Sequence, residues 1–273
     1  MPIAFLNRAL GGASRAFDTD VLSWRDAVVA NGGSVSLGRL IVVDQFVFSE
    51  KAAGTWALTD DYWGFWAENA AQALTSLKQR RLATAVNTPT FTADRDYTFD
   101  GSTNSIDTGF VPSTHAVAMT GTSQRIGVYE RTNVNAARNA IGCSATASRR
   151  MTLTPRSGTA AFANLNTAGG TNGLALWTVD SRGFKAVSRA GGSLTVKGYD
   201  RGVVLPDAVA GSVGTTLPEY SVFIGGVNDT GLLSSARASA VGFAVVGAPL
   251  SDAQELAQYN AMQAWATSVG AQV

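Results

Sequence analysis

Two patterns of hydrophobic positions follow each other along the chain. Up to about residue 83, apolar side chains recur every three or four positions, which is the period of an amphipathic helix. From about residue 84, short runs of alternating apolar and polar residues are separated by Gly, Asn, Ser or Pro, which is typical of strands and turns. We therefore expect a small helical region at residues 1–83 and a β-rich region, closed by a helix, at residues 84–273.

The helical pattern is clearest in three segments. Helices are predicted for residues 18–31, 36–53 and 251–268, with a shorter one after Asn69. Each of the three carries an apolar stripe, and Asn69 and Ser251 are residue types that cap a helix N-terminus. Helices of this length are marginal alone, so we expect them to pack on a larger neighbour.

An aromatic segment follows the second predicted helix. Trp56, Tyr62, Trp63, Phe65 and Trp66 place five rings within eleven positions. We interpret the segment as a core strand with its flanking turn. The alternative is an exposed platform that stacks on a ligand.

The rest of the chain reads as many short strands. Strands at this spacing, joined by turn residues, predict an antiparallel sandwich or barrel. The predicted strands are 115–121, 124–131, 138–145, 149–155, 159–166, 174–181, 184–190, 194–200, 221–227 and 237–247.

Composition narrows the class of protein. The chain has 273 residues, of which 45% are hydrophobic and only 15% charged, so it can bury a sizeable core under a surface of Ser, Thr, Asn and Gly. The single cysteine, Cys143, excludes an internal disulfide and a cysteine-based zinc site. The first residues do not form a signal-peptide pattern, and no apolar run has the length of a membrane span. We therefore expect synthesis in a cytoplasm and no membrane insertion.

The charge is unevenly distributed, although the net charge is only +1. Residues 125–201 carry eleven Lys or Arg and three Asp or Glu, a net charge of +8, and nine of the eleven cations are arginine. The segments on either side are net acidic. We call the cations of residues 125–201 the basic block.

The basic block supplies the candidate binding site. Arginine can bind a carboxylate or phosphate through two parallel hydrogen bonds, and aromatic rings between the arginines can stack on sugars. The alternative left open is that these charges pair with acidic parts of a neighbouring subunit. The candidate carbohydrate-binding residues are Tyr129, Arg131, Arg138, Arg149, Arg150, Trp177, Arg182, Tyr199, Asp200 and Arg201.

No residue set predicts a catalytic site. The five glutamates are far apart in the sequence, without the alternating pair of carboxylates that retaining glycosidases place on one strand. The only histidine, His115, has no nucleophile motif to serve. We assign no catalytic residue and no cofactor. A calcium ion near Asp94, Asp96, Asp100 and Asp107 stays open, since calcium prefers several oxygen ligands.

Three motifs, read in order, carry a family resemblance. The stretches FDGSTNSIDTGF, LTVKGYDRGVVL and VGFAVVGAPLSDAQELAQYNAMQAW resemble the early turn, the late hairpin and the closing strand and helix of concanavalin A-like, or laminin G-like, jelly rolls. The resemblance covers about residues 84–270. It implies a mainly β fold, an antiparallel jelly-roll sandwich with a small α-helical N-terminal region and a C-terminal helix.

The N-terminal part adds a second resemblance. KAAGTWALTDDYW, followed by AENAAQALTSLKQRRLATAVNTPTFTADRDYTFDGS, is similar to bacteriophage, prophage and gene-transfer-agent structural proteins. This resemblance implies a virion-surface adhesin (head spike, head fibre or tail tip) made in a bacterial cytoplasm. Its jelly roll would bind a host surface or capsular polysaccharide without cleaving it, and its N-terminal region would hold other virion proteins.

Further partners follow from the same interpretation. The basic block makes an acidic polysaccharide the expected ligand, and spike domains of this kind predict a homo-oligomer. The alternatives are a structural virion subunit whose basic face contacts another subunit and, less favoured, a glycan-degrading enzyme. Nucleic acid is not expected as a partner, because no recognition module is visible.

Overall fold

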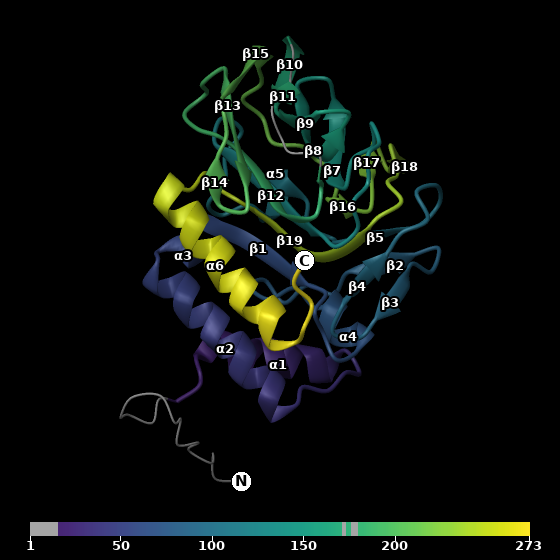
Figure 1. Cartoon of the computed structure of the whole chain (residues 1–273), viewed down its shortest axis with the longest axis vertical. Helices are drawn as coiled ribbons and strands as arrows, with labels where there is room; N and C mark the ends of the chain where they lie inside the picture. Colours follow the sequence, from purple (N-terminus) through teal and green to yellow (C-terminus); the bar gives the residue numbers. More distant parts are fainter. Residues whose placement is uncertain (1–15, 171–172, 176–179) are drawn as a thin grey trace.

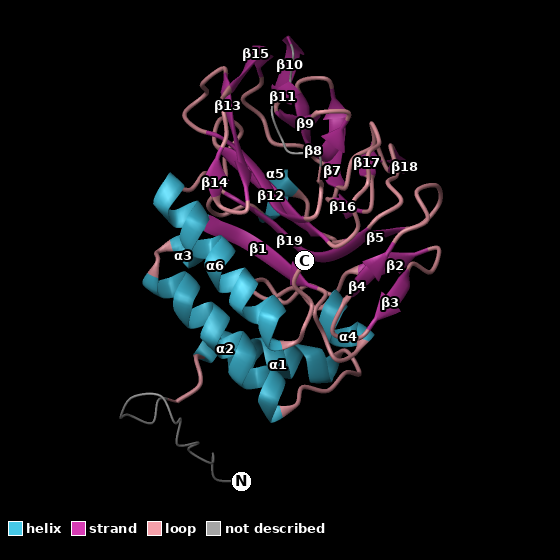
Figure 2. Ribbon diagram, in the orientation of Figure 1, coloured by secondary structure: helices cyan, strands magenta, loops and turns pink. Residues whose placement is uncertain are grey.

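A layer of helices and two β-sheets make up the part of the chain described by the computed structural model, residues 16–170, 173–175 and 180–273. The helices are α1 (Thr19–Ala30), α2 (Leu37–Ala52), α3 (Thr55–Leu58), α4 (Ala70–Leu74), α5 (Pro112–His115) and α6 (Asp252–Ser268). Three of them, α1, α2 and α6, lie together on one side of the molecule, and the strands lie on the other (Figure 1, Figure 2).

The sheet nearer to these helices is called the helix-facing sheet. It consists of β1 (Thr59–Gly64), β3 (Thr90–Thr92), β4 (Asp96–Thr98), β6 (Gln124–Glu130), β10 (Thr167–Gly170), β12 (Gly183–Arg189), β13 (Thr195–Asp200), β14 (Val203–Val204), β15 (Ala208–Val213) and β19 (Ala240–Gly247). Its main order is β10-β15-β13-β12-β6-β19-β4-β3, with β1 beside β19 and β14 beside β13. The central ladders, β12 with β6 and β6 with β19, are antiparallel.

The second sheet is called the outer sheet. It consists of β2 (Thr84–Val86), β5 (Ser105–Asp107), β7 (Ile141–Thr146), β8 (Arg149–Ser157), β9 (Ala160–Leu165), β11 (Gly173–Ala175), β16 (Phe223–Ile224), β17 (Val227–Asp229) and β18 (Leu232–Ser234). Its main order is β11-β9-β8-β7-β16-β5-β2. The strand β17 runs parallel to β7 and antiparallel to β18.

The space between the two sheets is one hydrophobic core. Successive side chains of a strand point to opposite faces, so only alternate residues enter it. Met151 and Leu153 of β8 are fully buried there, in one cluster with Ile126 and Val128 of β6. The side chains on the other face of β8, such as Thr152 and Thr154, point away from this core.

A second core lies between the helix-facing sheet and the helices. It is rich in aromatic rings: Phe46 of α2 lies 5.4 Å from Trp265 of α6, and Trp66 lies 5.3 Å from Phe243 of β19, measured between ring centroids. Trp66 is fully buried in this core, and Trp63 and Phe65 are fully buried in the core between the two sheets. The interpretation of residues 56–66 as a core segment is confirmed.

The fold class predicted from the sequence is confirmed: mainly β, a sandwich of two largely antiparallel sheets, with a C-terminal helix. The predicted long helices agree with α1, α2 and α6 to within a residue or two at each end. Ser251 caps α6 as expected, in a reciprocal pair with Gln254.

One predicted strand, 115–121, is wrong. Its first residue ends α5, and the next residues form a loop without a neighbouring strand. The main-chain N–H groups of Val117 and Ala118 donate to the carboxylate of Asp60, at 2.6 and 2.7 Å, in place of a strand partner. A side chain from elsewhere in the chain thus satisfies backbone groups that the alternating pattern assigned to a sheet.

The expected boundary between residues 83 and 84 does not separate two bodies in the described part of the chain. Strand β1, from the N-terminal region, pairs along β19 from Thr59 to Gly64. The side chain of Glu50 in α2 accepts a 2.7 Å hydrogen bond from Gln258 in α6. The N-terminal helices and the sandwich therefore share one core. None of the described helices combines the length and the apolar character needed to span a membrane.

Candidate functional site

Part of the basic block lies inside the protein. Arg125 of β6 makes two 2.6 Å hydrogen bonds to Glu255 of α6, and both side chains are 0% exposed. Lys185 of β12 forms a buried ion pair with Asp200, its ladder partner on β13. Arg189 is buried and donates to three main-chain carbonyl groups. These groups hold the layers together, so the prediction of a ligand contact is wrong for Asp200.

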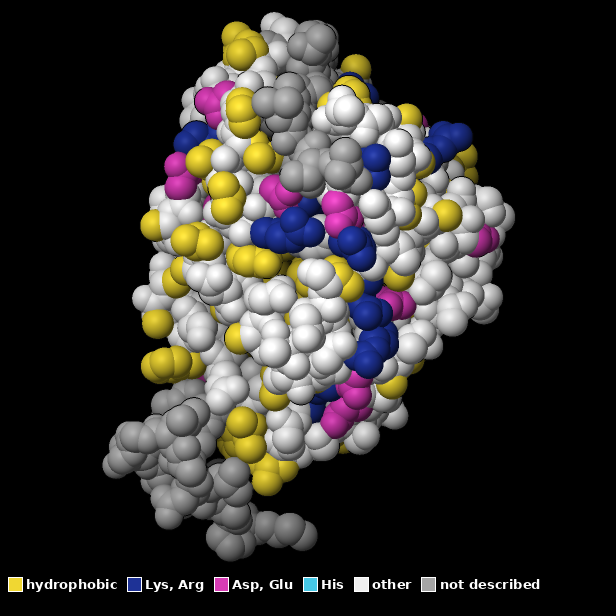
Figure 3. All heavy atoms as spheres, in the orientation of Figure 1, with side chains coloured by type: hydrophobic (Ala, Val, Ile, Leu, Met, Phe, Trp, Pro, Cys, Tyr) yellow, Lys and Arg dark blue, Asp and Glu magenta, His cyan; other side chains and the backbone are white. Residues whose placement is uncertain are grey.

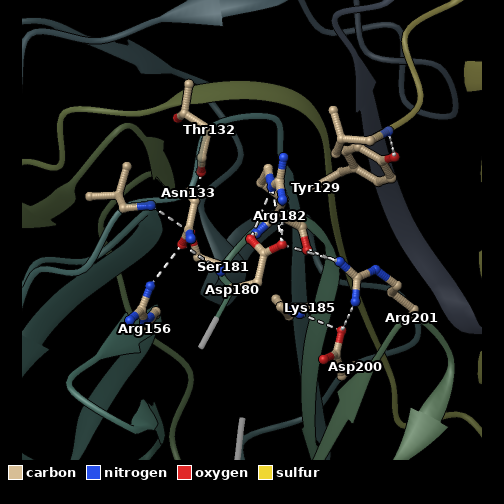
Figure 4. A network of polar contacts seen from close by, with 12 residues as sticks. Tyr129, Thr132, Asn133, Arg156, Asp180, Ser181, Arg182, Lys185, Asp200 and Arg201 are labelled. Carbon is tan, nitrogen blue, oxygen red and sulfur yellow. Dashed lines mark hydrogen bonds and ion pairs between the residues drawn. The ribbon is translucent and has the colours of Figure 1, made fainter. Parts of the chain in front are cut away.

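Two of the predicted contact residues, Arg182 and Arg201, meet at Asp180 (Figure 4). Arg182 Nη2 lies 2.8 Å and Arg201 Nη2 3.9 Å from Asp180 Oδ2. The hydrogen bonds from Arg182 lower the pKa of Asp180 to about 2. The cluster therefore carries its own counter-charge, and on the face seen in Figure 3 dark blue side chains similarly lie next to magenta ones.

The predicted stacking rings are not on the surface. Tyr129 and Tyr199 are both 0% exposed, in the core beneath the helices. The hydroxyl group of Tyr199 donates to Asp252 Oδ1 at 2.9 Å, and that of Tyr129 accepts from the main-chain N–H of Val273 at 3.0 Å. The prediction that these two rings stack on a sugar is therefore wrong. Trp177 lies outside the described residues.

Three further predicted arginines lie apart from one another. Arg131 pairs with Asp96 at 2.6 Å and donates to a main-chain carbonyl near the C-terminus. Arg149 pairs with Glu219 at 2.5 Å, across a partly exposed contact. Arg138 is exposed. The structure does not bring these side chains together into one site.

A groove of about 420 Å³ opens on the outer face of the outer sheet. Its lining comes from β8 and β9, from Ser144 of β7 and the segment before β7, from both ends of β17, and from the end of β18 with the residue after it. Most of the side chains that line it are neutral hydroxyl and amide groups: Asn139, Ser144, Thr152, Thr154, Ser157, Asn164, Ser234 and Ser235.

The polar groups of the groove are held in place by one another. Thr154 Oγ1 donates to Asn139 Oδ1 at 2.9 Å, and Asn139 Nδ2 donates to Ser235 Oγ at 2.9 Å. Asn164 Nδ2 donates to Thr152 Oγ1 at 3.3 Å, across the ladder between β9 and β8. Hydroxyl groups of this kind both donate and accept hydrogen bonds, as sugar hydroxyl groups do.

Among the residues that the structure describes, Arg150 is the one cation and the one predicted contact residue that lines this groove. Its side chain alternates with the core residue Met151, and it lies opposite Ser144 in the ladder with β7. Partial burial lowers the pKa of Arg150, while the nearby charge of Asp229 raises it. No carboxylate of the described chain lies within ion-pair distance of Arg150, and its Nε is buried without a hydrogen-bond partner. Arg150 can therefore accept an anionic ligand.

Phe162 is the aromatic residue among the described residues that line the groove, and it was not among the predicted contact residues. Its side chain is 41% exposed and lies opposite Thr154 in the ladder between β8 and β9. The signal was present in the run TAAFANLN, where Ala161, Ala163 and Leu165 alternate with it and are buried. A large apolar ring on the exposed side of an alternating strand indicates a candidate contact residue.

The four aspartates considered for calcium have protein partners. Asp100 accepts from the main-chain N–H groups of Ser102 and Thr103, and these bonds lower the pKa of Asp100. Asp94 pairs with Arg39, and Asp107 accepts from the main-chain N–H of residue 109. Within the described ranges, His, Cys, Asp and Glu side chains do not gather in threes as a metal site requires. The aspartates of this stretch shape turns and fasten neighbouring segments.

Comparison with known proteins identifies the fold. A scan against protein-family models and a sequence search of the curated proteins give no match. Among solved structures, the chain is similar to a Trypanosoma rangeli sialidase mutant displaying trans-sialidase activity (TM-score 0.53, 12% identity, 84% of this chain and 40% of that one). It is also similar to an HCR/D mutant (TM-score 0.51, 10% identity, 76% of this chain and 53% of that one).

A second sialidase structure gives the same picture. Trypanosoma rangeli sialidase in complex with 2-keto-3-deoxy-D-glycero-D-galacto-2,3-difluoro-nononic acid matches with a TM-score of 0.50 at 11% identity, over 83% of this chain. The chain spans only 40% of the length of that sialidase. At these identities the likeness establishes a shared β-sandwich fold alone.

Proposed function

We propose that this protein is a non-catalytic carbohydrate-binding protein and that the groove on the outer sheet binds a polysaccharide with acidic sugar residues. The observation that carries this proposal is the composition of the groove: hydroxyl and amide side chains around one exposed ring, Phe162, and one cation without a carboxylate partner, Arg150. Its volume of about 420 Å³ is within the usual range for ligand sites.

Each part of the groove matches a part of an acidic sugar. The ring of Phe162 offers an apolar face to the C–H groups of a pyranose. The hydroxyl groups of Thr152 and Thr154 and the carboxylate of Asp229 are hydrogen-bonding partners for sugar hydroxyl groups. The guanidinium group of Arg150 can hold a carboxylate through charge-assisted hydrogen bonds.

The fold likeness supports a glycan as the ligand class. One of the similar structures is a sialidase that holds a nononic acid, a sugar acid by its name. The likeness covers less than half of that sialidase, so the chemistry of the groove is the stronger support.

The carboxylate count supports binding without cleavage. Most glycosidases use two carboxylates, one on each side of the bond that is broken. Among the described residues that line the groove, Asp229 has the only carboxylate, and there is no tyrosine to act as a nucleophile. All twenty Asp and Glu residues of the sequence fall within the described ranges, so no further carboxylate is left to complete a pair.

The position of the groove supports an adhesin of a virus-like particle. The helices α1, α2 and α6 cover the helix-facing sheet, whereas the groove lies on the far face of the other sheet. A protein attached through its helical layer would therefore present the groove outward. In this proposal the helical layer contacts other particle proteins, and the groove binds a host surface or capsular polysaccharide.

A glycan array at low salt tests the ligand class, with Arg150→Gln as the main variant. Loss of one set of hydrogen bonds to a charged group is expected to weaken binding to acidic glycans about 10- to 100-fold. Arg149→Gln is the matched control, because it removes the same charge at the neighbouring position of β8. The Arg149 side chain does not line the groove and pairs with Glu219.

A second variant, Phe162→Ala, separates ring stacking from charge. It is expected to lower the affinity for acidic and for neutral glycans alike, by about 2- to 10-fold. Equal losses in the Arg149 and Arg150 variants would show that general charge, and not the groove, binds the glycan. Absence of any glycan binding by the folded protein would refute the proposal.

A further inference from the structure

A second cavity, also of about 420 Å³, lies on other elements and shares no residue with the groove. We call it the basic recess. It lies between the turn that follows α4 and the short helix α5. The side chains that line it and carry donor groups are those of Lys78, Gln79, Arg80, Arg81, Thr114 and His115.

The one carboxylate of the basic recess is already occupied. A bulge between Thr59 and Asp61 inserts Asp60 as an extra residue of β1. The Oδ1 atom of Asp60 accepts two main-chain hydrogen bonds, from Val117 and Ala118, and Oδ2 accepts one from Met119 at 3.0 Å. Asp60 therefore serves the loop after α5. Of the cations that line the recess, Lys78 donates to the main-chain carbonyls of Trp56 and Thr59 and Arg80 pairs with Asp20, which leaves Arg81 to face the recess.

Arg81 is held so that its terminal nitrogens stay available. Its Nε donates to Gln79 Oε1 at 2.9 Å. Gln79 Nε2 in turn donates to the main-chain carbonyls of Asp60 at 3.2 Å and of His115 at 2.9 Å, which fixes the amide between the two walls. No acceptor of the described chain bonds to Nη1 or Nη2 of Arg81, and no carboxylate pairs with it. The end of the guanidinium group is preorganised for an anion.

His115 adds a donor to the same recess. The main-chain N–H of Val111 donates to His115 Nδ1 at 2.8 Å, so the proton of the neutral ring is on Nε2. Burial and the nearby charge of Arg81 lower the pKa of His115, which favours this neutral form. Arg80 Nη1 lies 3.7 Å from Asp20 Oδ1, which is within ion-pair distance but too long for a hydrogen bond.

We propose that the basic recess is an oxyanion-binding site, in which the terminal nitrogens of Arg81 bind the anion and Arg80 and His115 support it. The shared chemistry of the ligand is a group of negatively charged oxygens. It can come from a tetrahedral sulfate or phosphate or from the carboxylate of an acidic sugar. The site is separate from the groove and does not depend on the function proposed for the groove.

Isothermal titration calorimetry of the whole protein tests the site with three probes: sodium sulfate, sodium phosphate and sodium glucuronate, each against sodium chloride at matched ionic strength. Arg81→Gln is expected to lower the affinity for the preferred anion about 10-fold or more. Arg25→Gln is the matched control, since Arg25 is a partly exposed arginine of α1 paired with Asp26. A preference for sulfate or phosphate assigns a tetrahedral ligand, and a preference for glucuronate assigns a sugar carboxylate.

A second variant covers the case in which Arg81→Gln does not fold. Thr114→Glu places a negative charge at an exposed position of the recess and is expected to abolish binding. Equal affinity in the wild type and the Arg81 or Thr114 variant overturns the proposal. The same loss in the Arg25 control, or no preference over chloride in the wild type, also overturns it.

Discussion

The buried ion pair between Arg125 and Glu255 allows a direct test of whether the cations of the basic block stabilise the fold. If the block serves mainly as scaffold, removing one partner should loosen α6 from the helix-facing sheet. Glu255→Gln keeps the shape of the side chain and leaves the guanidinium group of Arg125 without its carboxylate. Both side chains are 0% exposed, so water does not replace the lost partner.

The expected loss follows from that burial. Breaking a buried pair costs about 3–5 kcal/mol, because it leaves an uncompensated charge in a medium of low dielectric constant. A domain of this kind has about 5–15 kcal/mol of stability in total, so the change is a large fraction of it. The double variant with Arg125→Met and Glu255→Leu removes both charges and should recover most of the loss, because it leaves apolar side chains of similar volume.

Urea unfolding, followed by tryptophan fluorescence, measures these changes as shifts of the midpoint at constant slope. The control is Arg25→Met, which breaks the exposed pair with Asp26 and should cost about 0–1 kcal/mol. A wild-type midpoint for Glu255→Gln would refute the scaffold interpretation of Arg125. A double variant less stable than either single variant would show that the pair contributes more than an apolar contact.

Two further predictions concern buried groups. Burial raises the pKa of Asp61 from its ordinary 3.8 to about 6, so the folded protein keeps this proton to higher pH than the unfolded chain. Its contribution to stability is therefore complete below pH 3.8 and is lost as the pH rises through about 6, and Asp61→Asn should flatten that part of the midpoint-versus-pH curve. Burial raises the pKa of the Cys143 thiol to about 12, so iodoacetamide should react with this thiol only after the protein unfolds. Mass spectrometry measures the extent of labelling. Rapid labelling of the folded protein would contradict the burial of Cys143.

The elements could be predicted because local patterns determine them. The caps at Ser36 and Ser251 and the apolar stripes fix the long helices, and alternation fixes strands such as β6, β8 and β12. The segment 115–121 alternates in the same way but is not a strand. Its backbone partner is Asp60, more than fifty positions earlier, and no local pattern can reveal such a partner.

The candidate site could be predicted only in part, because alternation does not say which face of a strand meets solvent. Tyr129 and Phe162 are both rings on alternating strands. The face that carries Tyr129 is covered by the helical layer, and the face that carries Phe162 is exposed. The same ambiguity explains Arg125, which looked like a surface cation and is a core ion pair. Arg150 does line the groove, because the residues that alternate with it on β8, Met151 and Leu153, fill the core.

The arrangement of layers then limits where this sandwich can bind a ligand on a sheet. The inner faces of both sheets line the first core, and the aromatic core under α2 and α6 covers the central part of the outer face of the helix-facing sheet. The groove lies on the outer face of the outer sheet, which carries Arg150, Thr152 and Thr154 at alternate positions of β8. The cations of the basic block fall into groups by their position. Those that face inward pair with carboxylates or donate to carbonyl groups, and Arg150 alone lines the groove. Under the proposed function, a ligand on this face would meet one charge and many neutral hydrogen-bonding groups, a composition that matches a sugar acid better than a polyanion such as nucleic acid.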